Sequence, residues 1–265
     1  MGTRMDVLFW GLQYAYAQEA FQALLNEVNR LEGQLSQYDE NSPIAALNRD
    51  AGVKPVHVSQ EVLAVLSTCR HYFCHTRKLF DVTAATRSTC KGAGRKGAES
   101  MELNKKQSRA FLPEKGMRVD LGGIGKGIAL RNVRNIVHKF QITHAFISFG
   151  ERSILGLGRH PYGPHWQVGV ANVLDPQKSA CSFALKDLAL STSGNTPAHK
   201  GDIIHPRTHK PMEQTATFSV LTESPVEAEV LSTALLIGTE DERISLLKKF
   251  NPVRAVEVAY TNTGE

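Results

Sequence analysis

The glycine-rich run Asp120–Gly127, with the sequence DLGGIGKG, has residue types and spacing suited to binding a phosphate group. It lies between an expected strand and an expected helix, so its backbone N–H groups can approach an anion that the helix N-terminus also attracts. A Walker A loop is excluded because Asp120 and Gly127 occupy the places of its first glycine and its Ser or Thr. The spacing GxGxG also differs from the dinucleotide fingerprint GxGxxG. A tight turn with glycines for close packing explains the run equally well.

A carboxylate and a hydroxyl lie four residues apart on a helix that we expect to begin at Pro225. The preceding Ser224 and the following Glu227 form a capping box, with proline at the first helical position. Glu229 and Thr233 therefore share one face of this helix. Hard oxygen ligands of this kind suit Mg²⁺. Such a pair on a surface helix more often binds nothing, so the spacing alone leaves both interpretations open.

Three further groups of residues could react or bind. Asp202 and His205, three residues apart in DIIHPRTH, could supply a general base, and Arg207 could contact an anion. The alternative is that this segment has no catalytic role and forms a turn before its proline. The cluster Ser191–Gly194 is equally a loop or a phosphate contact. Tyr38 could stack on a planar ligand, although an aromatic residue more often belongs to the core.

The composition indicates an ordinary globular protein and excludes several classes. The 265 residues carry a net charge of +5, but the basic residues are scattered among acidic ones, and no basic stripe contains interleaved aromatic residues. We therefore expect no nucleic-acid partner. No CxxC spacing indicates a zinc site, no apolar run has membrane-spanning length, and the N-terminus does not resemble a signal peptide. The compartment stays open.

The hydrophobic patterns alternate irregularly between strand and helix periods. We expect strands over 5–11, 117–121, 144–149, 152–157, 166–171 and 216–222. We expect helices over 14–35, from Ser59, after Gly127, from Pro225 and after Thr239. This order favours a mixed α+β (α/β) fold with a mixed, largely antiparallel sheet flanked by helices. We expect one domain over 1–265, with 91–117 as a mobile loop or an inserted hairpin.

Taken in order, these segments resemble the FAD:protein FMN transferase (ApbE) family over nearly the whole chain. The matching pieces are MGT at 1–3, LSxYD at 35–39 with Ser42 and Leu47-Asn48, FDVT at 80–83, DLGGIGKG at 120–127, SFG at 148–150, STSG at 191–194, the segment 203–208 and the segment 228–235. The run at 120–127 is the most specific, since the family's form is DLGGIAKG. The resemblance implies a T-fold-like core.

The resemblance also implies a reaction and a set of site residues. FAD would be the substrate, and Mg²⁺ would be held by the Gly125 carbonyl, Glu229 and Thr233. A Thr or Ser hydroxyl of an acceptor protein would attack the FMN phosphorus, and AMP would leave, with Asp202, His205 and Lys126 as catalytic residues. The FAD contacts would come from Met1, Tyr38, Asn48, Thr83, Asp120, Gly122, Gly123, Lys126, Ser148, Gly150, Thr192, Ser193, Gly194 and Arg207. Members of the family are usually periplasmic or anchored by lipid at the inner membrane.

The chain departs from the family's pattern at several of these places. Glu229 replaces an Asp, Arg131 replaces an Asp, and Glu151 replaces a Gly. The family's HIIDPRTG is DIIHPRTH here, so Asp202 and His205 have exchanged places and His209 replaces a Gly. The alternative function is therefore a protein that binds FAD without transferring FMN, or that slowly hydrolyses FAD to FMN and AMP.

Overall fold

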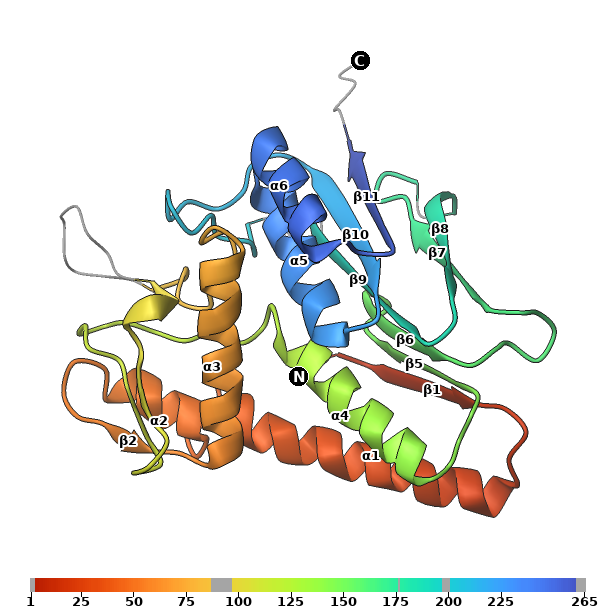
Figure 1. The fold of residues 1–265 in the computed structure, drawn as a ribbon, viewed down its shortest axis with the longest axis horizontal. Coiled ribbons are helices and arrows are strands. Elements are labelled where there is room, and N and C mark those ends of the chain that lie inside the picture. Colours follow the sequence, from red (N-terminus) through yellow and green to blue (C-terminus); the bar gives the residue numbers. More distant parts are fainter. Residues whose placement is uncertain (1–2, 87–96, 176, 197–200, 261–265) are drawn as a thin grey trace. The chain divides into compact units, whose positions relative to one another are not determined.

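The structure is a computed structural model that describes residues 3–86, 97–175, 177–196 and 201–260 (Figure 1). Contacts between Cα atoms divide the chain into two compact units. The first contains Asn29–Gly125 and Ile204–Pro211, and the second contains Gly2–Val28, Lys126–Ile203 and Met212–Glu265. The expectation of one functional domain over 1–265 stays a prediction. No helix of the described residues is long and apolar enough to cross a membrane.

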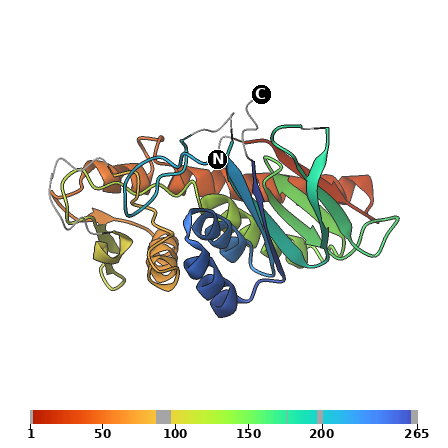
Figure 2. The same cartoon turned by 90° about the horizontal axis from the view of Figure 1, so that it is seen from above.

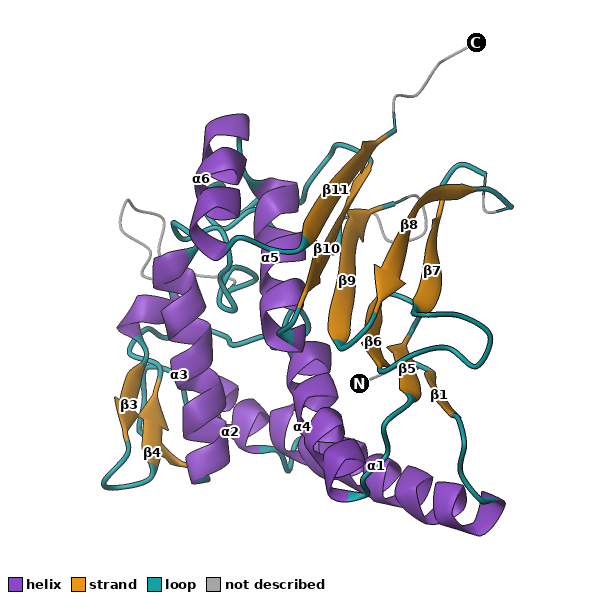
Figure 3. Ribbon diagram, turned by 45° about the vertical axis from the view of Figure 1, so that its right-hand side comes forward, coloured by secondary structure: helices purple, strands orange, loops and turns teal. Residues whose placement is uncertain are grey.

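The second unit is built on a six-stranded sheet in the order β1-β5-β6-β9-β10-β11, in which every neighbouring pair is antiparallel. Its strands are β1 (Met5–Phe9), β5 (Ala145–Phe149), β6 (Ser153–Leu157), β9 (Leu188–Asn195), β10 (Ala216–Thr222) and β11 (Arg254–Ala259). Figure 3 shows these strands side by side. The expected strands at 5–11, 144–149, 152–157 and 216–222 are confirmed, whereas β9 and β11 were not predicted.

The two faces of this sheet are covered by different elements. Helices α5 (Pro225–Ile237) and α6 (Glu240–Phe250) lie on one face, where α5 packs on β9 and β10 (Figure 2). On the other face a hairpin of β7 (Trp166–Ala171) and β8 (Ser179–Leu185) packs through Trp166 and Phe183 on Ile154 and Leu190. Because both faces of β10 are covered, all seven of its residues are buried, including the polar Thr217, Ser219 and Thr222.

The ends of these helices follow the predicted capping signals. Ser224 is the N-cap of α5 and accepts a hydrogen bond from the backbone N–H of Glu227, with proline at the first helical position. The Glu227 carboxylate does not complete this box, because it accepts from the Thr222 hydroxyl instead. The box of Thr239 and Glu242 at the start of α6 is complete. Helix α4 (Gly125–Lys139) begins at the end of the glycine run, and the N-terminal part of α1 (Tyr14–Leu35), up to Val28, also belongs to this unit.

The first unit combines short helices with a three-stranded sheet in the order β2-β4-β3. Its elements are α2 (Pro43–Arg49), β2 (Val56–His57), α3 (Gln60–His75), the 3₁₀ helix η1 (Ala98–Ser100), β3 (Glu102–Asn104) and β4 (Arg109–Phe111), together with the part of α1 from Asn29 onward. Ser59 caps α3 as predicted. The described part of 91–117 contains the β3–β4 hairpin, while 91–96 lie outside the described residues.

Two local predictions were wrong. Residues 117–121 are not a strand, because the backbone N–H and carbonyl of Val119 bond to the Asn48 side-chain amide at 2.7 and 2.9 Å rather than to a neighbouring strand. The cluster 191–194 is not a loop but the central part of β9. This strand is stabilised by packing on both of its faces. A sequence pattern based on apolar residues misses it, because its side chains here are small and mostly polar.

Candidate functional site

The glycine run begins with a turn that Asp120 closes. The Asp120 backbone N–H donates to the Val82 carbonyl at 2.8 Å, and its Oδ1 accepts from the backbone N–H of Gly122 at 2.8 Å. A Cβ on Gly122 would lie 3.1 Å from that carboxylate, and a Cβ on Gly123 would lie 3.4 Å from the Phe80 ring. The contact at Gly122 is tight, whereas the one at Gly123 is an ordinary van der Waals distance, and neither glycine has a positive φ. The packing interpretation therefore holds for Gly122.

Gly125 and Gly127, at the start of α4, differ sharply in their surroundings. A Cβ on Gly127 would lie 2.6 Å from the Pro225 carbonyl oxygen and 2.8 Å from Glu229 Cγ, so α4 approaches the first turn of α5 too closely for any other residue. A Cβ on Gly125 would meet no described atom within 4 Å. Gly127 thus fixes the two helices against each other, whereas Gly125 faces open space.

Glu229 is the central residue of the second unit's site, and it is only 4% exposed. Its Oε1 accepts hydrogen bonds from the hydroxyls of Ser153 on β6 and Ser191 on β9. Its Oε2 lies 3.8 Å from Nζ of Lys126, the second residue of α4. One oxygen of the carboxylate is therefore held by two hydroxyl groups of the sheet, and the other lies near the ammonium group of Lys126. Sequence reasoning missed Ser153, because no local signal tells which strand positions face α5.

A chain of hydroxyl groups continues from Glu229 to Thr233. The hydroxyl of Ser191 lies 3.2 Å from that of Ser232, which lies 2.8 Å from the hydroxyl of Ser193. Ser193 in turn contacts the Thr233 hydroxyl at 2.9 Å. Thr233 also lies 3.2 Å from the Glu229 carbonyl, to which its hydroxyl donates. The structure thus brings together Lys126, Glu229, Thr233 and Ser193, which were predicted from separate segments.

These side chains fit a magnesium ion better than a transition metal. No three His, Cys, Asp or Glu side chains converge anywhere in the described parts of the chain. A cation at Glu229 would therefore need hydroxyl, carbonyl, water or phosphate oxygens, which Mg²⁺ accepts. Glu229 Oε2 accepts no hydrogen bond from the described residues, and its only charged neighbour there is Lys126. The Gly125 carbonyl belongs to the other unit and stays a prediction as a ligand.

Other predicted FAD contacts lie on the opposite face of the same sheet. Side chains alternate along a strand, so Thr192 points away from Ser193 and shares a 2.8 Å hydrogen bond with Ser219. Gly194 lies against Thr217, whose methyl group would be 2.7 Å from an added Cβ. Ser148 on β5 is buried on this face, and its hydroxyl has no hydrogen-bond partner among the described residues. Their roles in binding FAD stay predictions.

The predicted contacts in the first unit have well-defined structural roles. Asn48 uses both atoms of its amide on Val119. Buried Thr83 donates its backbone N–H and its hydroxyl to Asp81 Oδ1 at 2.8 and 2.7 Å. Burial raises the pKa of the Asp81 carboxyl, and the two bonds from Thr83 oppose this shift. Tyr38 is 85% exposed, so the core interpretation of this residue is wrong.

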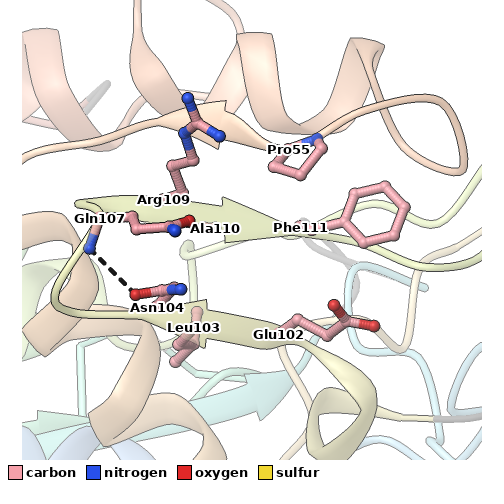
Figure 4. A pocket seen from close by; sticks show the side chains of 8 residues that line it. All are labelled: Pro55, Glu102, Leu103, Asn104, Gln107, Arg109, Ala110 and Phe111. Atoms are coloured by element: carbon pink, nitrogen blue, oxygen red, sulfur yellow. Dashed lines mark hydrogen bonds between the residues drawn. The ribbon is translucent and has the colours of Figure 1, made fainter.

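The first unit also contains a shallow pocket on the β3–β4 hairpin (Figure 4). Glu102, Arg109 and Phe111 line it together with Pro55 and residues of the hairpin turn. None of the residues predicted for FAD lines it. The pocket therefore does not belong to the candidate site.

The two candidates for the general base lie in different units. Asp202 is exposed, and its charge opposes the effect of burial, which lowers the pKa of the Arg152 guanidinium. The Nδ1 atom of His205 accepts from the backbone N–H groups of Arg207 and Thr208 at 3.2 and 3.4 Å. The Arg207 side chain is exposed and donates to the Arg77 carbonyl at 3.4 Å. His205 thus closes its own turn.

Glu151 and His209, which replace two glycines of the family's pattern, lie at backbone positions that favour glycine. Glu151 has a φ of 60° and His209 has a φ of 55°, in the left-handed region that other residues rarely adopt. Both side chains are exposed. Gly150, with a φ of 57°, keeps the family's glycine. Met1, the remaining predicted FAD contact, lies outside the described residues.

Comparison with known proteins agrees with the predicted family and fold. The FAD:protein FMN transferase of Vibrio cholerae is 24% identical over 276 residues, which cover 93% of this chain and 80% of the relative. That of Haemophilus influenzae is 22% identical over 268 residues, covering 88% and 75%.

Among solved structures, the flavin transferase ApbE of Vibrio cholerae gives a TM-score of 0.79 at 21% identity, covering 100% of this chain and 92% of that one. The ApbE protein of Thermotoga maritima gives 0.80 at 20% identity, covering 97% and 90%. These structures confirm the mixed α/β fold with antiparallel sheets and flanking helices. The model described as the ApbE family matches residues 1–256, and the chain therefore belongs to the ApbE family.

Proposed function

We propose that this chain is a Mg²⁺-dependent FAD:protein FMN transferase. The observation that carries the proposal is the buried Glu229, which keeps one carboxylate oxygen toward Lys126 and leads through hydroxyl groups to Thr233. Its distant relatives are FAD:protein FMN transferases. The substrate would be FAD, and the partner would be an acceptor protein with a Thr or Ser to be flavinylated.

The chain's own residues would bind and orient the reacting groups. Lys126 supplies a cation for a phosphate oxygen, and Glu229 and Thr233 would hold the ion. Mg²⁺, when bound, polarises a diphosphate and neutralises its charge. The acceptor hydroxyl attacks the FMN phosphorus, the bond to the AMP oxygen breaks, and AMP leaves. Of the two candidate bases, Asp202 is favoured, because the His205 Nδ1 lone pair is already used within its turn.

The second candidate function is FAD binding without transfer, or slow hydrolysis to FMN and AMP. The glycine positions occupied by Glu151 and His209 favour it, because left-handed backbone at other residues is strained. Both functions require FAD to bind. Only transfer requires a covalent phosphoester on the acceptor.

The test is incubation of the protein with FAD, Mg²⁺ and a peptide that contains an acceptor Thr, followed by mass spectrometry of the peptide. Transfer adds FMN to the peptide and releases AMP. Glu229→Gln keeps the size of the side chain and an acceptor for the serines, so it is a better variant than Glu229→Ala, which would leave buried hydroxyls unpaired. We expect it to lose Mg²⁺-dependent labelling.

Glu227→Gln is the matched control, since it makes the same change two residues earlier on α5, and it should label the peptide normally. Asp202→Asn and His205→Gln separate the two candidate bases by the same readout. FAD binding without labelling by the unmodified protein would contradict the transferase and leave the second candidate. Normal labelling by Glu229→Gln would contradict the role of Glu229 in holding the ion.

A further inference from the structure

Strand β6 is preceded by an arginine, Arg152, that is not among the expected site residues. The backbone N–H of Thr192 donates to the Arg152 carbonyl at 2.8 Å, so the pairing of β6 with β9 continues through this residue. The next residue, Ser153, donates its hydroxyl to Glu229. Because successive side chains along a strand alternate between the two faces, Arg152 belongs to the face that carries the Thr192 side chain.

This face of the sheet has an apolar part and a polar part. The β7–β8 hairpin packs on Ile154 in the apolar part. In the polar part, Thr192 lies opposite Arg152 and pairs with Ser219, with which its side chain shares a 2.8 Å hydrogen bond. Thr217, two residues earlier on β10, is buried, and its hydroxyl has no hydrogen-bond partner among the described residues. Arg152 therefore borders a group of hydroxyls.

The Arg152 guanidinium is half-buried and has no acceptor within the described part of the chain. It forms neither a hydrogen bond nor an ion pair there. Burial lowers its pKa, and the charge of the exposed Asp202 opposes this shift. A charged group that has lost part of its hydration without gaining a partner is unfavourable. An oxygen atom of a bound ligand would supply the acceptor.

The chemistry of this group indicates which part of FAD it contacts. Guanidinium has only N–H donors and no acceptor. Glu229, which is proposed to hold the ion on the diphosphate, is contacted from the other face of the sheet. The part of FAD that meets the Thr192 face is therefore the flavin or the adenosine. The flavin ring carries two carbonyl oxygens, whereas adenine carries an amino group that itself donates hydrogen bonds.

We propose that Arg152 is a further FAD-binding residue, whose guanidinium donates to a carbonyl oxygen of the flavin ring. The inference rests on the FAD binding that the proposed function requires. It gives Arg152 a role in the affinity for the flavin half of FAD and none in the affinity for the nucleotide half.

The test is isothermal titration of the full chain with FAD and Mg²⁺, without an acceptor peptide, followed by displacement of FAD with ADP. ADP keeps the adenosine and the diphosphate but has no flavin. Arg152→Gln should weaken FAD binding about 10–100-fold, as expected for the loss of a hydrogen bond from a charged group, and should leave ADP binding unchanged. Arg152→Lys keeps the charge without the forked donors and should show a smaller loss. Arg159→Gln, an exposed arginine at the other end of β6, is the matched control and should bind FAD normally.

The possible outcomes separate this inference from the proposed function. Equal FAD affinity in Arg152→Gln and the unmodified protein overturns the inference alone. An equal loss of affinity for FAD and ADP also overturns it, because Arg152 would then contact the diphosphate or support the fold, which circular dichroism of the variant distinguishes. If the unmodified protein bound no FAD, the proposed function would fail, and the inference with it.

Discussion

Replacing Gly127 with alanine should destabilise the protein, although alanine is the better helix former. The added methyl group would lie 2.6 Å from the Pro225 carbonyl oxygen, 2.8 Å from Glu229 Cγ and 2.9 Å from Val226 Cα. Two of these atoms belong to the backbone and cannot rotate away, so α4 and α5 must separate. Overpacking of this kind costs about 1–3 kcal/mol, whereas the higher helix propensity of alanine returns about 1 kcal/mol.

The overpacking cost should lie in the upper part of its range because two of the clashing atoms belong to the backbone. After the gain in helix propensity is subtracted, the expected net loss of stability is about 1–2 kcal/mol. It corresponds to a decrease in melting temperature of about 2–8 °C for a domain of this size. The measurement is thermal unfolding followed by circular dichroism. Gly125→Ala is the matched control, since its methyl group meets no described atom within 4 Å, and it should be neutral or slightly stabilising. A Gly127→Ala protein as stable as the unmodified one would refute the close approach of α4 to α5.

The remaining predictions concern a strained loop and two thiols. Glu151→Gly should raise the free energy of unfolding by about 0.5–1 kcal/mol, because glycine adopts the left-handed backbone without strain. The substitution loses only an exposed 3.5 Å contact with Arg4. Glu151→Ala keeps the strain and is the control, and an equal gain in stability there would contradict this reasoning. Burial raises the pKa of the Cys69 thiol to about 12, so it stays protonated up to pH 9. Iodoacetamide should therefore modify exposed Cys74 and spare Cys69 in the native protein, as measured by peptide mass spectrometry; comparable modification of Cys69 would show that it is not buried.

The sequence predicted the elements whose ends carry local signals. Ser59, Ser224 and Thr239 cap the helices expected after them, because capping depends on a few adjacent residues. It did not predict β9, since its second half, STSGN, is polar and contains a glycine and an asparagine, which are depleted in strands. That strand exists because α5 covers one of its faces and the opposite face is also covered.

The candidate site was predictable in its residue types but not in its connections. The spacing of Glu229 and Thr233 follows from helix geometry, whereas the bonds from Ser153 and Ser191 to Glu229 depend on the register of β6 against β9, which pairs these two serines directly. Register is a tertiary property, set by burial of a whole face. The same register explains why neighbouring Thr192 and Ser193 point to opposite faces.

The positions at which this chain differs from the family's pattern bear on whether it transfers FMN. Arg131, Glu151 and His209 are all exposed, whereas Glu229 is buried at the end of the hydroxyl chain that leads to Thr233. Left-handed backbone at Glu151 and His209 costs stability of order 1–3 kcal/mol each, which lowers the free energy of unfolding. Of the substitutions that motivate the second candidate function, Glu151 and His209 thus lie outside the helices and strands and Arg131 is an exposed residue of α4, while Lys126 and the buried serines contact Glu229. Since the charge that a phosphoryl transfer requires is provided by oriented groups rather than by loop conformation, the transferase is the stronger of the two proposals.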